Sequence, residues 1–89
     1  MEFYILAVFR SRTQTTLFDR LLRSYHIPAS VVSAPSSLQV GCSVGVKIPV
    51  NYLNSALTLF DRRHFDSFVG FYKITKMDGR TAVSPVVKG

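Results

Sequence analysis

The stretch EFYILAVF, residues 2–9, decides the fold of this 89-residue chain. It combines aromatic and branched apolar residues without Gly or Pro, which is typical of a strand that is buried on both faces. We therefore expect a central strand here. Glu2 precedes the apolar run and Arg10 closes it, so the run lacks the basic start and the cleavage site of a signal peptide. No apolar run approaches the roughly 18 residues of a membrane span, and we expect no span.

A helix is predicted directly after this strand. Ser11 can accept a hydrogen bond from the backbone N–H of Gln14 while the Gln14 side chain reaches back, which together form a capping box. Apolar residues then recur at helical spacing and predict one buried stripe, made of Leu17, Phe18, Leu21, Leu22 and Tyr25. We expect the helix to end before Pro28, because a proline disfavours the helical conformation of the preceding residue.

Two further strands are predicted on either side of a polar loop. Residues 29–33 form the first, and residues 34–37 have the composition of a loop. Residues 40–48 alternate in a pattern typical of a half-buried strand. The outward positions of this strand include Gly41, Ser43 and Gly45, so either a neighbouring segment or a ligand should approach it closely.

The second half of the chain repeats the helix and the strand. Asn51 can cap a helix whose apolar stripe runs to Phe60, and residues 68–74 predict a strand. The turn signal Asp78-Gly79 follows, so the remaining residues predict either a short hairpin or a frayed tail.

This order of elements, β-α-β-β-α-β, predicts the fold class. We expect an α+β, ferredoxin-like sandwich, in which a four-stranded antiparallel sheet carries two helices on one face. The hydrophobic content of 47% is sufficient for a packed core, and the chain is too short for two such units. We therefore expect one domain over residues 1–75 and a C-terminal extension over residues 76–89.

Cys42 is the single cysteine of the chain, which excludes an intramolecular disulfide and a multi-cysteine metal site. A free thiol is typical of the reducing cytoplasm, where we expect the protein. The histidines, His26 and His64, both lie at predicted helix ends. The chain shows no carboxylate dyad, glycine-rich phosphate loop or metal-ligand spacing, so we expect neither a cofactor nor an enzyme that is sufficient by itself.

The surroundings of Cys42 admit two interpretations. Glycine and serine leave room beside the thiol, and backbone amides that converge on it would lower its pKa and make it a nucleophile. Cys42 also shares the alternation of Val44 and Val46, which predicts a small buried side chain instead. The candidate site comprises Cys42, Gly41, Ser43, Pro35, Ser36 and Ser37.

Five short motifs follow one another along residues 3–74: FYI at 3–5, FRS at 9–11, HIP at 26–28, APSSL at 34–38 and GCS at 41–43. In their order and spacing they resemble the selenium/sulfur carrier protein-like family. His26, Ser36 and Ser43 stand where that family has glycine, arginine and glycine. The resemblance implies that Cys42 holds a sulfur or selenium atom as a persulfide-type adduct. It also implies that donor and acceptor proteins load and unload this thiol, without an acid–base dyad.

The formal charge of +6 bears on the partners. A basic surface attracts an acidic protein or keeps the domain soluble. Nucleic acid is the less favoured partner, because the longer signature of an RNA-recognition domain belongs on the third strand, where residues 44–47 contain no aromatic side chain.

Besides an acidic protein and nucleic acid, a second copy of this chain is the third kind of partner that the sequence suggests. Alternate aromatic residues of the first and fourth strands, Phe3 or Tyr4 and Phe71 or Tyr72, should lie on the sheet face that the helices leave open. Such an apolar patch favours association through the open face.

Overall fold

The computed structural model describes residues 1–38 and 43–88, which form five strands and two α-helices. The elements are β1 (Glu2–Phe9), α1 (Arg12–Ser24), β2 (Ser30–Ser33), β3 (Val44–Ile48), the 3₁₀ turn η1 (Val50–Tyr52), α2 (Leu53–Asp61), β4 (Phe68–Met77) and β5 (Arg80–Lys88). The predicted α+β class is confirmed. The predicted count of four strands is wrong, because β5 adds a fifth.

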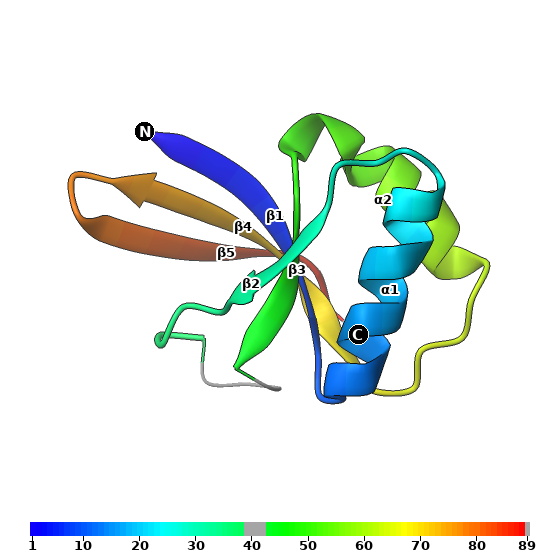
Figure 1. The fold of residues 1–89 in the computed structure, drawn as a ribbon. Helices are drawn as coiled ribbons and strands as arrows, with labels where there is room; N and C mark the ends of the chain where they lie inside the picture. The colour runs from blue at the N-terminus through cyan, green and yellow to red at the C-terminus, as the bar shows by residue number, and fades with distance from the viewer. Residues whose placement is uncertain (39–42, 89) are drawn as a thin grey trace.

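The strands form one antiparallel sheet in the order β2-β3-β1-β4-β5. β1 therefore lies at the centre, as its continuous apolar sequence predicts, and its residues from Tyr4 onward are buried. Both helices pack on the same face of the sheet (Figure 1). β2 and β5 are the two edge strands of the sheet.

The extra strand depends on the turn between β4 and β5. Asp78 and Gly79 have φ values of 49° and 76°, and Met77 pairs with Arg80. Positive φ at both central residues is the geometry of the hairpin turn whose twist matches that of the strands. Of the two alternatives for the end of the chain, the structure contains the hairpin.

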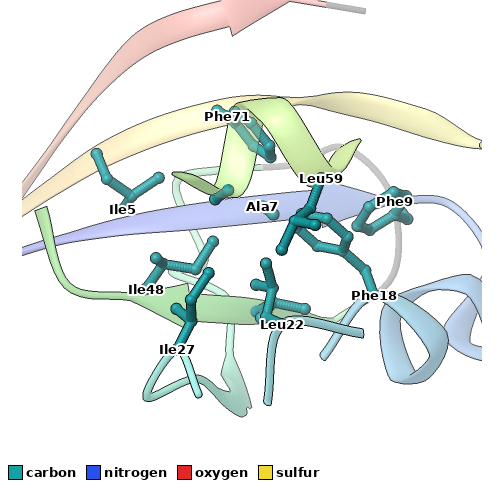
Figure 2. Close-up of a cluster of buried hydrophobic side chains, with 11 residues drawn as sticks. Ile5, Ala7, Phe9, Phe18, Leu22, Ile27, Ile48, Leu59 and Phe71 are labelled. Atoms are coloured by element: carbon teal, nitrogen blue, oxygen red, sulfur yellow. The ribbon is translucent and has the colours of Figure 1, made fainter. Parts of the chain in front are cut away.

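The main core lies between the helices and the sheet (Figure 2). Phenylalanines dominate one end of it: the ring of Phe18 lies 5.5 Å from that of Phe9 and 6.0 Å from those of Phe60 and Phe71. These three contacts are tilted, edge-on and stacked, respectively, and such ring contacts stabilise the core beyond the burial of apolar area. This cluster joins α1, α2, β1 and β4.

The start of α1 is capped as predicted, but the capping box is not formed. The Ser11 Oγ accepts from the Gln14 N–H at 3.2 Å. The Gln14 side chain turns away: its Nε2 donates to Asp66 at 2.6 Å, and its Oε1 accepts from the Ser67 N–H at 3.1 Å. Gln14 thus connects α1 to the two residues that precede β4 instead of closing its own cap.

The buried face of α1 is rotated relative to the predicted stripe. Leu17 and Tyr25 are 44% and 54% exposed, whereas Thr15 and Asp19 are buried. Thr15 can be buried because its Oγ1 donates to the Ser11 carbonyl at 3.0 Å. Asp19 Oδ2 forms an ion pair of 2.8 Å with Arg23, while Asp19 Oδ1 is buried with no hydrogen-bond partner among the described residues.

The start of α2 also differs from the prediction. Asn51 does not cap it, because this residue belongs to η1, and no side chain in the described part of the chain caps either η1 or α2. The first turn of this helical segment is instead made through the Tyr52 N–H, which donates to the Pro49 carbonyl at 2.9 Å. Pro49 is compatible with this geometry because the missing N–H of a proline is not needed at a helix start.

The sheet face opposite the helices carries a second cluster, formed by Tyr4, Leu6, Val8, Ile74 and Leu38. We expected this face to be open and aromatic. Tyr4 is instead only 3% exposed, and the ammonium groups of Lys47 and Lys76 lie 4.9 and 5.7 Å from its ring.

The other three aromatic residues of the predicted patch are distributed differently. Phe71 is buried under the helices, Tyr72 is half-buried, and only Phe3 is substantially exposed. The Lys73 ammonium lies 4.7 Å from the ring of Phe3.

The small residue Gly45 faces this second cluster. A Cβ atom there would lie 2.8 Å from Leu6 Cγ and 3.0 Å from the Ala7 carbonyl oxygen. Of the two explanations for the small residues of β3, a close neighbouring segment is the one found at this position.

Candidate functional site: the connection between β2 and β3

The predicted site lies in the connection from β2 to β3. Gly41 and Cys42 lie outside the described residues. The structure places the other four: Pro35 is half-buried, and Ser36, Ser37 and Ser43 are exposed.

The base of the connection is closed by the backbone. The Ala34 N–H donates to the Ser43 carbonyl at 2.8 Å, next to the last β2–β3 pair, Ser33 with Val44. A backbone hydrogen bond between the two ends of a loop holds these ends together and lowers the conformational entropy of a loop. Ala34 and Ser43 are therefore held together directly beside the last pair of β2 and β3.

A turn follows this base. The Leu38 N–H donates to the Pro35 carbonyl at 3.0 Å, which encloses Ser36 and Ser37. Serine is common in such turns because it tolerates their backbone conformations. Neither hydroxyl has a hydrogen-bond partner among the described residues, so both are available to solvent or to a bound molecule.

Leu38 anchors the turn on the sheet. Its side chain is 9% exposed and packs in the second cluster with Tyr4, Leu6 and Val8. The turn therefore lies on the face away from the helices (Figure 1). Our site prediction did not include this anchor, although Leu38 is the one large apolar residue within residues 34–38.

The titratable groups of the described residues do not form a catalytic arrangement. His26 and His64 are exposed and lie at the ends of the two helices, and no three potential metal ligands of the described part converge. Asp66 accepts a hydrogen bond from Gln14, and no ion pair joins it to Arg62 or Arg63 among the described residues.

The carboxyl group of Glu2 has a shifted pKa. Lys47 Nζ donates to Glu2 Oε2 at 3.0 Å, and this hydrogen bond with its charge lowers the pKa of Glu2 below 4.5. The pair joins the exposed start of β1 to β3, so it is a surface feature of these two strands and not part of the β2–β3 connection.

A family model described as "Putative Se/S carrier protein-like" matches residues 4–67. The match extends from β1 to the residue before β4 and includes the whole β2–β3 connection. No curated protein and no solved structure was found to match the chain. Among the described residues, no helix is long and apolar enough to cross a membrane.

Proposed function

The chain belongs to the Se/S carrier protein-like family, and on this basis we propose that it is a non-enzymatic carrier of sulfur or selenium. Cys42 is the proposed carrier thiol, with Gly41, Ser43, Pro35, Ser36 and Ser37 around it. The observation that carries the proposal is the family match, since it spans all six of these residues.

The proposed chemistry needs one thiolate and a loaded partner. The Cys42 thiolate attacks the outer sulfur of a persulfide, R–S–SH, on a donor protein. A new S–S bond forms on Cys42, the S–S bond of the donor breaks, and the donor leaves as a thiolate, R–S⁻. The proton stays on the transferred sulfur, so the exchange involves no external oxidant or reductant. An acceptor thiolate unloads Cys42 by the same step.

The described part of the connection supports this role. A carrier thiol must be reached by two different proteins, which favours a loop of fixed closure with small side chains. The Ala34–Ser43 bond supplies the closure, and Ser36, Ser37 and Ser43 supply small exposed residues. Because sulfur exchange needs no general acid or base beyond the thiolate, the exposed positions of both histidines agree with a non-enzymatic carrier.

The fold and the location complete the proposal. We infer that β1 to β4 with the two helices form a ferredoxin-like unit, because the β-α-β-β-α-β order and the neighbours β2-β3-β1-β4 agree with a split βαβ repeat. We retain residues 1–75 as the carrier domain and residues 76–89 as its extension. A free thiol favours the cytoplasm.

Partners other than donor and acceptor proteins have less support. Homodimerisation through the face opposite the helices remains a prediction, and the burial of Tyr4 leaves Tyr72 as its half-buried aromatic residue. We do not expect nucleic acid binding. Salt-dependent binding to mixed RNA and DNA at low ionic strength would contradict that expectation.

The test is the intact mass of the protein after incubation with a persulfide-bearing donor protein. We expect the wild type to gain the mass of one sulfur atom and to lose it to an added acceptor thiol protein. Cys42→Ser should gain nothing. A Cys42→Ser, Ser36→Cys double variant moves the thiol to an exposed position of the same turn and serves as the matched control.

Two outcomes would contradict the carrier role. The first is a folded wild type that forms no adduct and reacts slowly with an alkylating reagent, which would identify Cys42 as a core residue of a structural or protein-interaction domain. The second is equal loading of the relocated thiol, which would show that any exposed thiol is sufficient.

A further inference from the structure

The segment after α1, η1 and the start of α2 lie together at one end of the helix layer (Figure 1). The side chains of these segments and of α2 line a groove. Its volume is about 450 Å³. We call it the Tyr–Arg groove, and its lining residues are Tyr25, Ile27, Tyr52, Ser55, Thr58, Leu59 and Arg62.

The wall formed by Tyr25 is held by the C-terminal cap of α1. The His26 N–H donates to the Arg23 carbonyl at 3.0 Å, the Ile27 N–H donates to the Leu22 carbonyl at 3.1 Å, and His26 has φ of 62°. These two bonds with a left-handed residue form a Schellman cap, a defined chain reversal. The reversal leaves Tyr25 exposed and buries Ile27, so the backbone of this wall of the groove has a defined conformation.

The groove combines an apolar floor with polar groups at its border. Ile27 and Leu59 are buried in the main core and form the floor. Arg62 lies at the end of α2 and has no ion-pair partner among the described residues. The hydroxyls of Tyr25 and Tyr52 likewise have no hydrogen-bond partner in the described part of the chain.

We propose that the Tyr–Arg groove docks an acidic segment of a partner protein. One large apolar side chain of the partner lies over Ile27 and Leu59, and a neighbouring carboxylate binds Arg62. Tyrosine and arginine around a pocket are the residue types that carry most binding energy at protein interfaces. An unpaired arginine on a chain of net charge +6 selects a carboxylate.

The same observations disfavour other occupants. Two copies of the chain would bring two basic surfaces together, at a cost in electrostatic free energy. A nucleic acid presents phosphates to every part of its site, whereas the floor of this groove is apolar and its border has one arginine. The inference rests on the proposed function only in that a carrier needs donor and acceptor proteins, and it requires no reaction at Cys42.

The experiment is selection of binders from a displayed library of random twelve-residue peptides against the full chain. We expect the selected peptides to combine acidic residues with one large apolar residue. Their affinity, measured by fluorescence anisotropy, should fall about tenfold with Arg62→Glu. Tyr25→Ser, a change of an exposed side chain, should also weaken binding.

Arg63→Glu is the matched control. It makes the same change of charge at the next residue, which lines a different hollow with Asp61 and His64. We expect its effect to stay within about threefold, as for an interaction at the rim. Equal losses for Arg62→Glu and Arg63→Glu, basic or neutral selected peptides, or no selected peptide at all would overturn the proposal.

None of these measurements involves sulfur transfer. A failure of peptide binding with normal loading of Cys42 would therefore refute the groove alone. A failure of loading with specific peptide binding would refute the carrier role alone.

Discussion

Leu38→Ala most directly tests whether the Leu38 side chain anchors the turn of the candidate loop, the connection between β2 and β3. The leucine is 9% exposed and packs on Tyr4, Leu6, Val8 and Ile74. Truncating a buried leucine costs about 2–5 kcal/mol, and the lower end applies where the surroundings can relax. Leu38 belongs to a connection on the sheet surface, so we expect a loss of about 2 kcal/mol.

Urea denaturation followed by far-UV circular dichroism measures this loss, since the chain has no tryptophan. For a domain of this size, about 2 kcal/mol corresponds to a fall in Tm of roughly 10 °C. The variant should stay folded, because domains typically have about 5–15 kcal/mol of stability. The slope m should not change, because the same surface becomes exposed on unfolding.

The matched control is Leu17→Ala, the same truncation at a leucine that is 44% exposed on α1. We expect its effect to stay within about 0.5 kcal/mol, as for an ordinary surface position. Equal effects of the two substitutions would refute the conclusion that Leu38 anchors the turn. Amide exchange gives a local check: the Leu38 N–H, bonded to Pro35, should exchange faster in a variant in which the turn loosens.

Two further predictions concern the sheet and a surface charge. Gly45→Ala should destabilise the protein by about 1–3 kcal/mol in urea denaturation, because its Cβ would lie 2.8 Å from Leu6 Cγ. Gly79→Ala meets no atom within 4 Å and should cost only the left-handed strain of about 1–2 kcal/mol, so a larger loss at Gly79 would contradict the steric argument. Lys47 lowers the pKa of Glu2. The stabilisation of the fold by this ion pair is therefore present at neutral pH and is lost as the pH falls through the lowered pKa of Glu2. An NMR titration of Glu2 should show the pKa rise toward 4.5 in Lys47→Met, and an unchanged pKa would exclude this ion pair as its cause.

Local chemistry made parts of the fold predictable. β1 could be recognised because a strand that is buried on both faces needs a continuous apolar sequence, and the Ser11 cap because it involves residues three apart. The small residue at Gly45 correctly indicated a close approach, since only a position without a side chain admits Leu6 there.

The errors came from contacts between distant parts of the chain. The partners of Gln14 are 52 and 53 residues away in the sequence, so its capping role was overestimated. Asp19 is polar by type and is buried because Arg23 pairs with it, which changed the buried face of α1. The sheet face opposite the helices was expected to be open because nothing local predicts that Leu38 covers Tyr4.

In the candidate site, too, the local features were predictable from the sequence and the contacts between distant residues were not. The loop character of residues 34–37 followed from proline and serine, and the turn closed by Leu38 and Pro35 confirms it. The anchoring of that turn depends on a cluster built from β1 and β4, which are distant in the sequence, so it could not be derived from the loop sequence. The role of Cys42 remains a prediction from the resemblance and the family match.

The short edge strand β2 connects the two proposed interaction regions. Ile27 in the Tyr–Arg groove precedes the start of β2 at Ser30, and the candidate loop begins after its end at Ser33. A strand of four residues spans about 13 Å. β2 is the outer strand of the sheet, and a border strand can be approached from the helix side and from the opposite side. A partner that docks in the groove can therefore follow the β2 edge to the loop on the other face.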